Sequence, residues 1–297
     1  AWGGNSSGQL GDGTTISKSS PVKIGSSSWS SVSSGITHTA AIDTTGALYT
    51  WGFNVYGQLG DGTLVNKSSP VKIGSNSWSV LSGGYFSLIA IDTTGALYTW
   101  GINTTGQLGD GTIVNKSSPV KIGTSSWSMV SAGIAIDINS NLYTWGNNTY
   151  GQLGDGTTIS KSSPVMLMTP LWSKTFGGIF YCRAITGWGT LYTWGYNNVG
   201  QLGINNTVSY VPVPTNINTL QASPTLIAAG LSHTVISGQY ANTNYLYAVG
   251  GDNYGQLGDG TTINSTFNQN QSVVQTPKNT YKYINTLIAG GNFTIKK

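Results

Sequence analysis

One short stretch of sequence recurs six times and sets the spacing of the whole chain. It reads Gly-Gln-Leu-Gly-Asp-Gly-Thr in most copies and is shortened to Gly-Gln-Leu-Gly in one, and the copies start at Gly8, Gly57, Gly106, Gly151, Gly200 and Gly255. Successive copies start 49, 49, 45, 49 and 55 residues apart. A period of this size that runs from end to end indicates a repeat architecture, in which each unit buries its apolar face against its neighbours.

Each unit carries the signals of about four short strands. In the first unit, residues 39–42 and 47–51 flank the turn Asp43-Thr44-Thr45-Gly46, which is typical of an antiparallel hairpin. Residues 21–24 and 29–32 add two more β-type runs, and no helical periodicity accompanies them. The sequence therefore predicts an all-β fold, a β-propeller of four-stranded antiparallel blades that forms a single domain over residues 1–297.

The number of repeats predicts six blades, or seven if the chain is a fragment of a longer protein. The last unit stops at residues 292–295, where a Leu-Tyr-Thr-Trp-Gly strand would follow, while Ala1-Trp2-Gly3 matches the end of such a strand. We expect the N- and C-terminal segments to pair in one blade, because this pairing closes the ring and leaves no long strand edge exposed.

The recurring motifs resemble the repeat of the regulator of chromosome condensation family. The resemblance rests on the hairpin, Leu-Tyr-Thr-Trp-Gly, Gly-Gln-Leu-Gly, Ser-Pro-Val and Gly-x-x-His-Thr, and it covers essentially the whole chain. It implies a β-propeller, most often of seven blades. Members of the family include a nucleotide exchange factor on chromatin, a bacterial β-lactamase inhibitor and a plant ultraviolet photoreceptor, so the resemblance implies a fold and leaves the function open.

The residues that most catalytic and metal sites need are scarce. Charged residues make up 7% of the chain, glutamate is absent, and there are 2 histidines. The chain therefore does not supply the residues for a nucleophile–His–Asp triad or for hydrolysis by paired carboxylates. Each Gly-Asp-Gly-Thr loop offers one carboxylate, whereas calcium takes about six to eight oxygen ligands. We therefore expect no catalytic residue, no metal site and no cofactor, and we do not expect an enzyme.

Composition also narrows the range of partners. The net charge of +4 comes from 13 Lys and Arg against 9 acidic residues, and these basic residues are too thinly spread for specific nucleic-acid binding. No run approaches the length of apolar sequence that a membrane span needs. A protein or a glycan is the expected partner, and membership of a larger assembly stays open.

Candidate contact residues fall into two groups. Four lysines precede Ser-Ser-Pro-Val at the blade period and should lie in an arc on one rim, where they either attract an anionic surface or are simply solvated: Lys18, Lys67, Lys116 and Lys161. The second group lies where units depart from the repeat, at the altered turn that holds Trp188 and in the enlarged stretches that hold Tyr240, Tyr245 and Phe267. An exposed Trp188 would contact a sugar face or a partner protein; the alternative is that its ring folds back onto its own blade.

We interpret the chain as a non-enzymatic binding or structural propeller, displayed outside a cell or on the surface of a virus particle. This interpretation depends on the scarcity of charge and on a composition rich in Ser, Thr, Asn and Gly, which suit a durable exposed module. Two alternatives remain. One is an intracellular regulator of the nucleotide-exchange or chromatin-docking type, for which the alternative location is cytoplasmic. The other is a protein inhibitor that acts through the irregular face of units five and six.

Overall fold

The structure is a computed structural model that describes residues 1–131, 133–167, 170–178, 180–217, 223–240, 243–266, 287–289 and 294–296. The chain divides into two compact units, residues 1–147 with 160–168, and residues 148–159 with 169–297. Within the described residues, every named element is a β-strand. The predicted all-β fold is therefore confirmed. Whether the two units make one domain stays a prediction.

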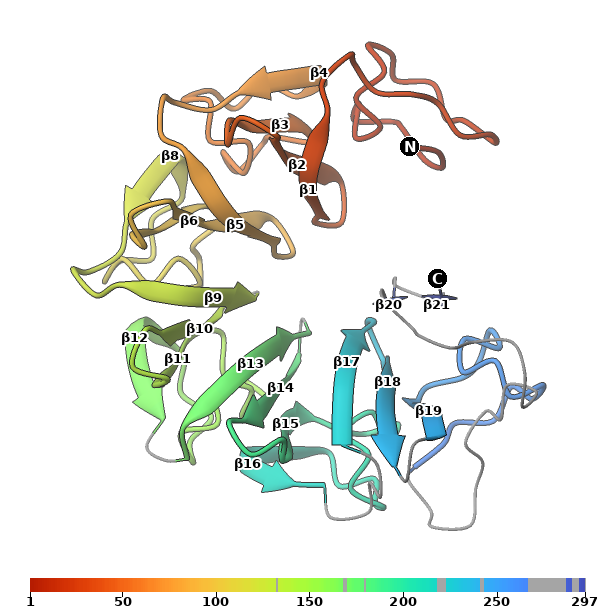
Figure 1. Ribbon diagram of the computed structural model, residues 1–297. Coiled ribbons are helices and arrows are strands. Elements are labelled where there is room, and N and C mark those ends of the chain that lie inside the picture. The colour runs from red at the N-terminus through yellow and green to blue at the C-terminus, as the bar shows by residue number, and fades with distance from the viewer. Residues whose placement is uncertain are drawn as a thin grey trace. The chain divides into compact units, whose positions relative to one another are not determined.

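The first unit contains three four-stranded antiparallel sheets (Figure 1). The first sheet consists of β1 (Trp29–Ser34), β2 (His38–Asp43), β3 (Leu48–Gly52) and β4 (Lys67–Lys72). The second consists of β5 (Trp78–Gly83), β6 (Ser87–Asp92), β7 (Leu97–Gly101) and β8 (Lys116–Lys121). The third consists of β9 (Trp127–Ser131), β10 (Ile134–Asp137), β11 (Leu142–Gly146) and β12 (Lys161–Leu167). In each sheet the strands lie in chain order, as expected for propeller blades.

The second unit continues the same pattern and then departs from it. The fourth sheet consists of β13 (Trp172–Gly177), β14 (Tyr181–Thr186), β15 (Leu191–Tyr196) and β16 (Tyr210–Asn216). The fifth has three strands, β17 (Ser223–Ala229), β18 (His233–Tyr240) and β19 (Thr243–Gly250), and a single bridge from Gly250 to Ser265 marks the place of a fourth. A two-stranded sheet of β20 (Leu287–Ala289) and β21 (Thr294–Lys296) follows.

An aspartate fixes the hairpin between the second and third strands of a blade. In the first blade, Asp43 Oδ1 accepts hydrogen bonds from the backbone N of Thr45 at 2.8 Å and of Ala47 at 3.0 Å, and from Thr45 Oγ1 at 2.6 Å. Gly46 takes a φ of 85°, which a residue without a side chain adopts freely. The Asp-x-x-Gly turn predicted from the sequence is confirmed here, and its geometry sets the register Ile42 to Leu48 of β2 and β3.

Two series of tryptophans hold the blades together. One tryptophan begins the first strand of a blade and another lies near the end of the third, and the ring centroids of the pairs Trp29–Trp51, Trp78–Trp100, Trp127–Trp145 and Trp172–Trp194 are 5.9, 6.1, 6.4 and 6.3 Å apart. The second ring of each pair also donates a hydrogen bond to the backbone carbonyl of the glutamine in a Gly-Gln-Leu-Gly loop. For Trp100, the acceptor is Gln58 O at 3.0 Å. The rings belong to apolar cores such as that of Ala40, Leu88 and Trp100, so the tryptophans join neighbouring blades.

The fifth blade lacks this indole, because Val249 stands at the register of Trp194. The carbonyl of Gln201, which the missing indole would bond, instead accepts hydrogen bonds from Arg183 Nη2 and Thr234 Oγ1. Arg183 comes from β14 of the preceding blade, is fully buried, and places its guanidinium carbon 4.6 Å from the centre of the Tyr181 ring. Its Nε and Nη1 have no hydrogen-bond partner within the described residues. Arg183 thus substitutes for the missing indole as a donor.

The prediction of six blades is corrected by the structure. The described residues form five blades, and the sixth repeat contributes only the β20–β21 pair. The reason is that a motif copy does not equal a blade: five copies each follow the third strand of one of these blades, whereas the first copy, at Gly8, precedes β1. The count of seven, expected for a fragment, is not met either.

Residues 1–3 pair with residues 18–22 in the first unit. Gly3 forms an antiparallel bridge with Lys18, and the backbone N of Val22 donates to Ala1 O at 2.8 Å. This pairing corresponds to the pairing of the third and fourth strands in the complete blades. Pairing of these residues with the C-terminal segment would join the two units and stays a prediction.

Candidate functional site

The Gly-Gln-Leu-Gly-Asp-Gly-Thr loop is a structural turn built around a buried asparagine. In the third copy, Asn103 Nδ2 donates to Asp110 Oδ1 at 3.0 Å and to the carbonyls of Thr112 at 3.1 Å and Val114 at 3.2 Å. Its Oδ1 accepts from the backbone N of Leu108 at 2.9 Å. The Asn103 side chain therefore satisfies hydrogen-bonding groups in both halves of the loop. The glycines and the Thr112 hydroxyl shape a rigid turn, as predicted, and do not cradle a phosphate.

The predicted lysines Lys18, Lys67 and Lys116 pair with the aspartate of their own loop. The Nζ atoms of Lys18, Lys67 and Lys116 lie 3.3, 3.4 and 3.3 Å from the Oδ2 atoms of Asp12, Asp61 and Asp110. The side-chain hydrogen bond from Thr14 is the largest of the effects that lower the pKa of Asp12 to about 2, so this carboxylate keeps its charge. Lys161 begins β12 at the same register. These pairs offset the positive charge along the rim, and anion binding by the lysines stays a prediction.

Trp188 is exposed at the tip of the β14–β15 hairpin. Its side chain is 79% exposed, so the sequence expectation of an exposed turn is confirmed and the ring does not fold back onto its blade. The tip is fixed on both sides, since the backbone N of Gly187 donates to Leu171 O at 3.0 Å and that of Gly189 donates to Thr186 O at 3.0 Å. Leu171 is itself 56% exposed, so two large apolar side chains lie on neighbouring segments of this tip.

The remaining aromatic candidates are placed only in part. Tyr240 ends β18 and pairs with Thr243 across the hairpin, and Tyr245 lies on β19 opposite Gly238. Phe267 lies outside the described residues. The structure therefore brings both tyrosines onto one hairpin, which is a different hairpin from the β14–β15 hairpin that carries Trp188.

Sequence reasoning missed an aromatic cluster in the first unit. Phe86 is the hub, with ring centroids 5.7 Å from Phe53, 5.3 Å from Tyr56 and 4.7 Å from Tyr85. Tyr85 is 46% exposed and sits on the loop between β5 and β6, next to the neighbouring blade's Ile36, whose backbone N donates to its carbonyl at 3.5 Å. The signal was a local departure from the repeat, since Tyr85 and Phe86 stand where the first unit has Ile36 and Thr37.

Groups that could serve catalysis are buried and separate. Burial raises the pKa of the Cys182 thiol to about 12 and lowers the pKa of His38 to about 4. Across the residues that the structure describes, no group of three or more His, Cys, Asp or Glu side chains could hold a metal ion. Within the described residues, no helix is long and apolar enough to cross a membrane.

Comparison of the sequence with family profiles matches the regulator of chromosome condensation (RCC1) repeat. The matches cover residues 1–42, 45–90, 94–135, 139–175 and 189–237, and a second profile of the same repeat matches residues 29–58. A search of curated proteins finds no match.

Solved structures share the fold at low sequence identity. Human WBSCR16 is 21% identical, with a TM-score of 0.82 over 98% of this chain and 79% of that protein. Yeast RCC1 (Prp20), solved with Kap60 bound to it, is 20% identical, with a TM-score of 0.81 over 99% of this chain and 75% of that protein. A Saccharomyces cerevisiae Prp20p structure, described with its binding to Gsp1p and histones, has 20% identity and a TM-score of 0.58 over 99% and 90% of the two chains. At these identities the likeness shows the fold alone.

Proposed function

The chain belongs to the regulator of chromosome condensation (RCC1) repeat family, and from that premise we propose that it is a non-enzymatic binding module whose contact with a partner protein is centred on Trp188. The observation that carries the proposal is the 79% exposure of this indole on a fixed hairpin tip. Tryptophan is the residue most enriched among side chains that dominate protein–protein binding energy, since its large rigid ring loses little conformational freedom on binding.

The surroundings of Trp188 fit a protein contact. Leu171 extends the apolar surface, and no charged side chain lies within the turn itself, residues 186–190. Structures of the same fold are described with protein partners, namely Kap60, Gsp1p and histones for yeast Prp20. This supports a protein as the class of partner. We extend the proposal to the absence of catalysis, because the buried Cys182 thiol and His38 imidazole are not accessible to a substrate.

The test uses capture of partners by the intact chain. Trp188→Ala should reduce recovery of the partner at least tenfold, since loss of a hot-spot tryptophan costs about 2 kcal/mol or more. Tyr254→Ala is the matched control, because Tyr254 is another exposed aromatic, 73% exposed, at a different loop of the same unit. Equal recovery by the Trp188 variant and the parent protein would remove Trp188 from the interface.

The place of action forms a second part of the proposal. We place the protein outside a cell or on a virus particle, on the support of the 7% content of charged residues and the Ser, Thr, Asn and Gly-rich composition. Protease treatment of intact cells or particles should then cleave the protein. Complete protection, together with recovery only from cytosol or nucleus, would contradict this location and leave the Trp188 contact standing.

The fold of the neighbours favours one alternative, an intracellular regulator of nucleotide exchange. Yeast RCC1 shares the fold over 99% of this chain. The two candidates separate in a single measurement, the rate at which a small GTPase releases a fluorescent guanine nucleotide. The binding-module proposal expects no acceleration by the protein, and a large acceleration would favour the alternative.

A further inference from the structure

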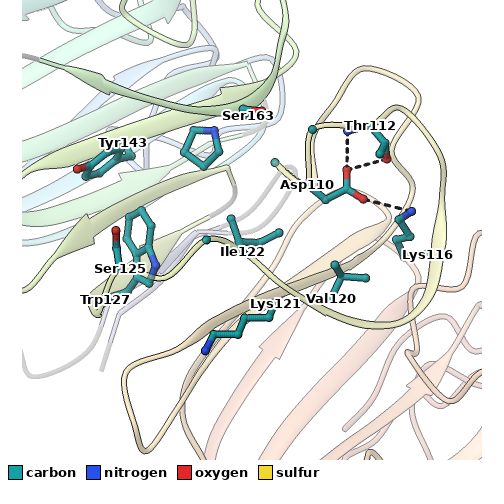
Figure 2. A pocket seen from close by; sticks show the side chains of 14 residues that line it. Asp110, Thr112, Lys116, Val120, Lys121, Ile122, Ser125, Trp127, Tyr143 and Ser163 are labelled. Carbon is teal, nitrogen blue, oxygen red and sulfur yellow. Dashed lines mark hydrogen bonds and ion pairs between the residues drawn. The ribbon is translucent and has the colours of Figure 1, made fainter.

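A cleft of about 630 Å³ lies between the second and third blades of the first unit (Figure 2). Its walls come from β8, from the turn that follows β8, from β9, β11 and β12 of the next blade, and from the Gly-rich loop at residues 109–112. Clefts of roughly 300–1,000 Å³ accept small organic groups. Of the residues that the sequence put forward as contacts, Lys116 lines this cleft.

The floor of the cleft is apolar and partly aromatic. Tyr143 packs edge-on against the buried ring of Trp127, with ring centroids 5.0 Å apart, and Val120 and Pro164 line the walls on either side. Tyr143, Val120 and Pro164 are each half-buried, so their surfaces are open to a ligand. A surface of this kind packs against the C–H face of a sugar ring, which is apolar although its edges carry hydroxyls.

Neutral hydrogen-bonding groups surround this floor. Ser125 and Ser163 are exposed at opposite sides (Figure 2). Their hydroxyls both donate and accept hydrogen bonds, which matches the hydroxyls of a sugar. Lys121 also lines the cleft.

Of the two lysines that line the cleft, Lys116 is already paired. Asp110 Oδ2 lies 3.3 Å from Lys116 Nζ, and Asp110 Oδ1 accepts from the backbone N and the Oγ1 of Thr112 at 2.9 and 2.7 Å. Desolvation opposes ionisation of Asp110, but the hydrogen bonds from Thr112, Asn103 and Lys116 hold its pKa below the ordinary value. Because Asp110 and Lys116 neutralise each other, Lys116 adds little attraction for a carboxylate or phosphate.

The same arrangement recurs one period earlier. Lys67 pairs with Asp61 at 3.4 Å, and the ring of Tyr98 lies 5.3 Å from that of Trp78 in the same edge-on geometry. Three serines take equivalent places opposite a glycine of the loop, namely Ser69, Ser118 and Ser163. A ligand that itself repeats can therefore contact several blades at once, and linked contacts raise the overall affinity.

We propose that the cleft at Tyr143 and Ser163, together with its counterparts in the preceding blades, binds neutral oligosaccharide. An apolar floor of sugar-ring size, exposed hydroxyls around it, a Lys116 charge paired within the protein and repetition at the blade period all fit an uncharged, repeating, hydroxyl-rich polymer. This site is separate from the Trp188 tip. Its failure therefore leaves the proposed protein contact untouched.

Binding is measured by calorimetry with four neutral polysaccharides, dextran, laminarin, mannan and galactan, and with heparin as the charged comparison. We expect at least one neutral polymer to bind, at least tenfold more tightly than its own trisaccharide because the clefts act together. Binding of heparin alone would overturn the proposal, since it would reveal a site driven by the lysines. Failure of all four neutral polymers to bind would overturn it as well.

Variants locate the site. The triple variant Ser69→Trp, Ser118→Trp and Ser163→Trp fills the clefts and should weaken polymer binding at least tenfold. The matched control carries three tryptophans at exposed hairpin tips, as Thr44→Trp, Thr93→Trp and Ile138→Trp, and should bind like the parent protein. Lys121→Gln, which keeps a hydrogen-bond donor, should bind within a few-fold of the parent. Undiminished binding by the filled variant, with both triple variants folded by circular dichroism, would show that the clefts are not the site.

Discussion

The replacement of an indole by Arg183 in the fifth blade can be tested by restoring the repeat. In the second blade, Trp100 donates to Gln58 O, and Ala40 of the preceding blade belongs to the same apolar cluster. At the fifth blade, Val249 stands at the place of Trp100, and Arg183 of the preceding blade stands at the place of Ala40. The double variant Arg183→Ala and Val249→Trp would therefore recreate an arrangement that the chain already uses elsewhere.

Each single change should destabilise the protein. Arg183→Ala removes a fully buried side chain and one of the two donors to Gln201 O, and truncation of a large buried side chain costs about 2–5 kcal/mol. Relief of a buried charge whose Nε and Nη1 have no partner offsets part of that cost. Val249→Trp alone places an indole against the Arg183 side chain, and overpacking of this kind costs about 1–3 kcal/mol.

The double variant should be at least as stable as the parent protein. A restored indole buries roughly 100 Å² of additional apolar surface, about 2.5 kcal/mol at 25 cal/mol per Å². Its hydrogen bond to Gln201 O contributes about 1 kcal/mol more. We therefore expect a coupling free energy of about 3 kcal/mol between the two sites in a double-mutant cycle.

The assay is urea unfolding of the four proteins, followed by tryptophan fluorescence and circular dichroism, with the slopes compared to confirm the same transition. Free energies that add within about 0.5 kcal/mol would refute the reasoning, because independent sites behave in that way. The change Ala40→Arg in the first blade provides the converse control. It introduces the arginine beside an intact indole and should only destabilise.

Four further predictions follow from single positions. Burial lowers the pKa of His38 from 6.5 to about 4, so the unfolded chain protonates first as the pH falls; stability is full above pH 6.5, should decrease by about 3 kcal/mol by pH 4, and His38→Phe should flatten that part of the profile. Asn54→Ala removes five hydrogen bonds that hold the second Gly-rich loop, between 2.9 and 3.3 Å, and urea unfolding should show a loss of about 2–4 kcal/mol. Gly60→Ala should cost more than about 3 kcal/mol in the same assay, since the glycine has a φ of 74° and an added Cβ would meet the Trp100 ring at 2.6 Å. Lys67→Gln should change stability by less than about 1 kcal/mol, because its ion pair is partly exposed, and a larger loss would mean that the pair is structural.

The repeat spacing predicted the blades well because their contacts are local. A hairpin capped by Asp43 and the strand that ends at Trp51 involve residues close in sequence, so their pattern is readable without coordinates. The prediction was wrong for residues 21–24, which form no strand. Their counterparts in β4 pair with a full third strand, whereas in residues 21–24 the backbone pairing is that of Val22 with Ala1.

The site features were harder to predict because they join residues from different repeats. Trp188 could be found from the sequence, since an indole at the register of Thr45, in the middle of a hairpin turn, has few buried positions open to it. The Tyr85 cluster and the cleft at Tyr143 could not, because each combines side chains of two blades. The hydrogen bond from Arg183 to Gln201 O could not be predicted from the sequence of a single repeat either, because it joins one repeat to the next.

The two proposed binding surfaces differ in how they use the repeat, and this difference fixes their stoichiometry. Trp188 exists because the turn at residues 186–189 has Thr-Gly-Trp-Gly in place of Asp-x-x-Gly, so a partner that needs it binds once per chain. The cleft at Tyr143 exists because the pattern is retained in successive blades, so a ligand that fits it finds several equivalent places. One unique contact favours recognition of a defined protein surface, and several equal contacts favour a polymer whose own units repeat.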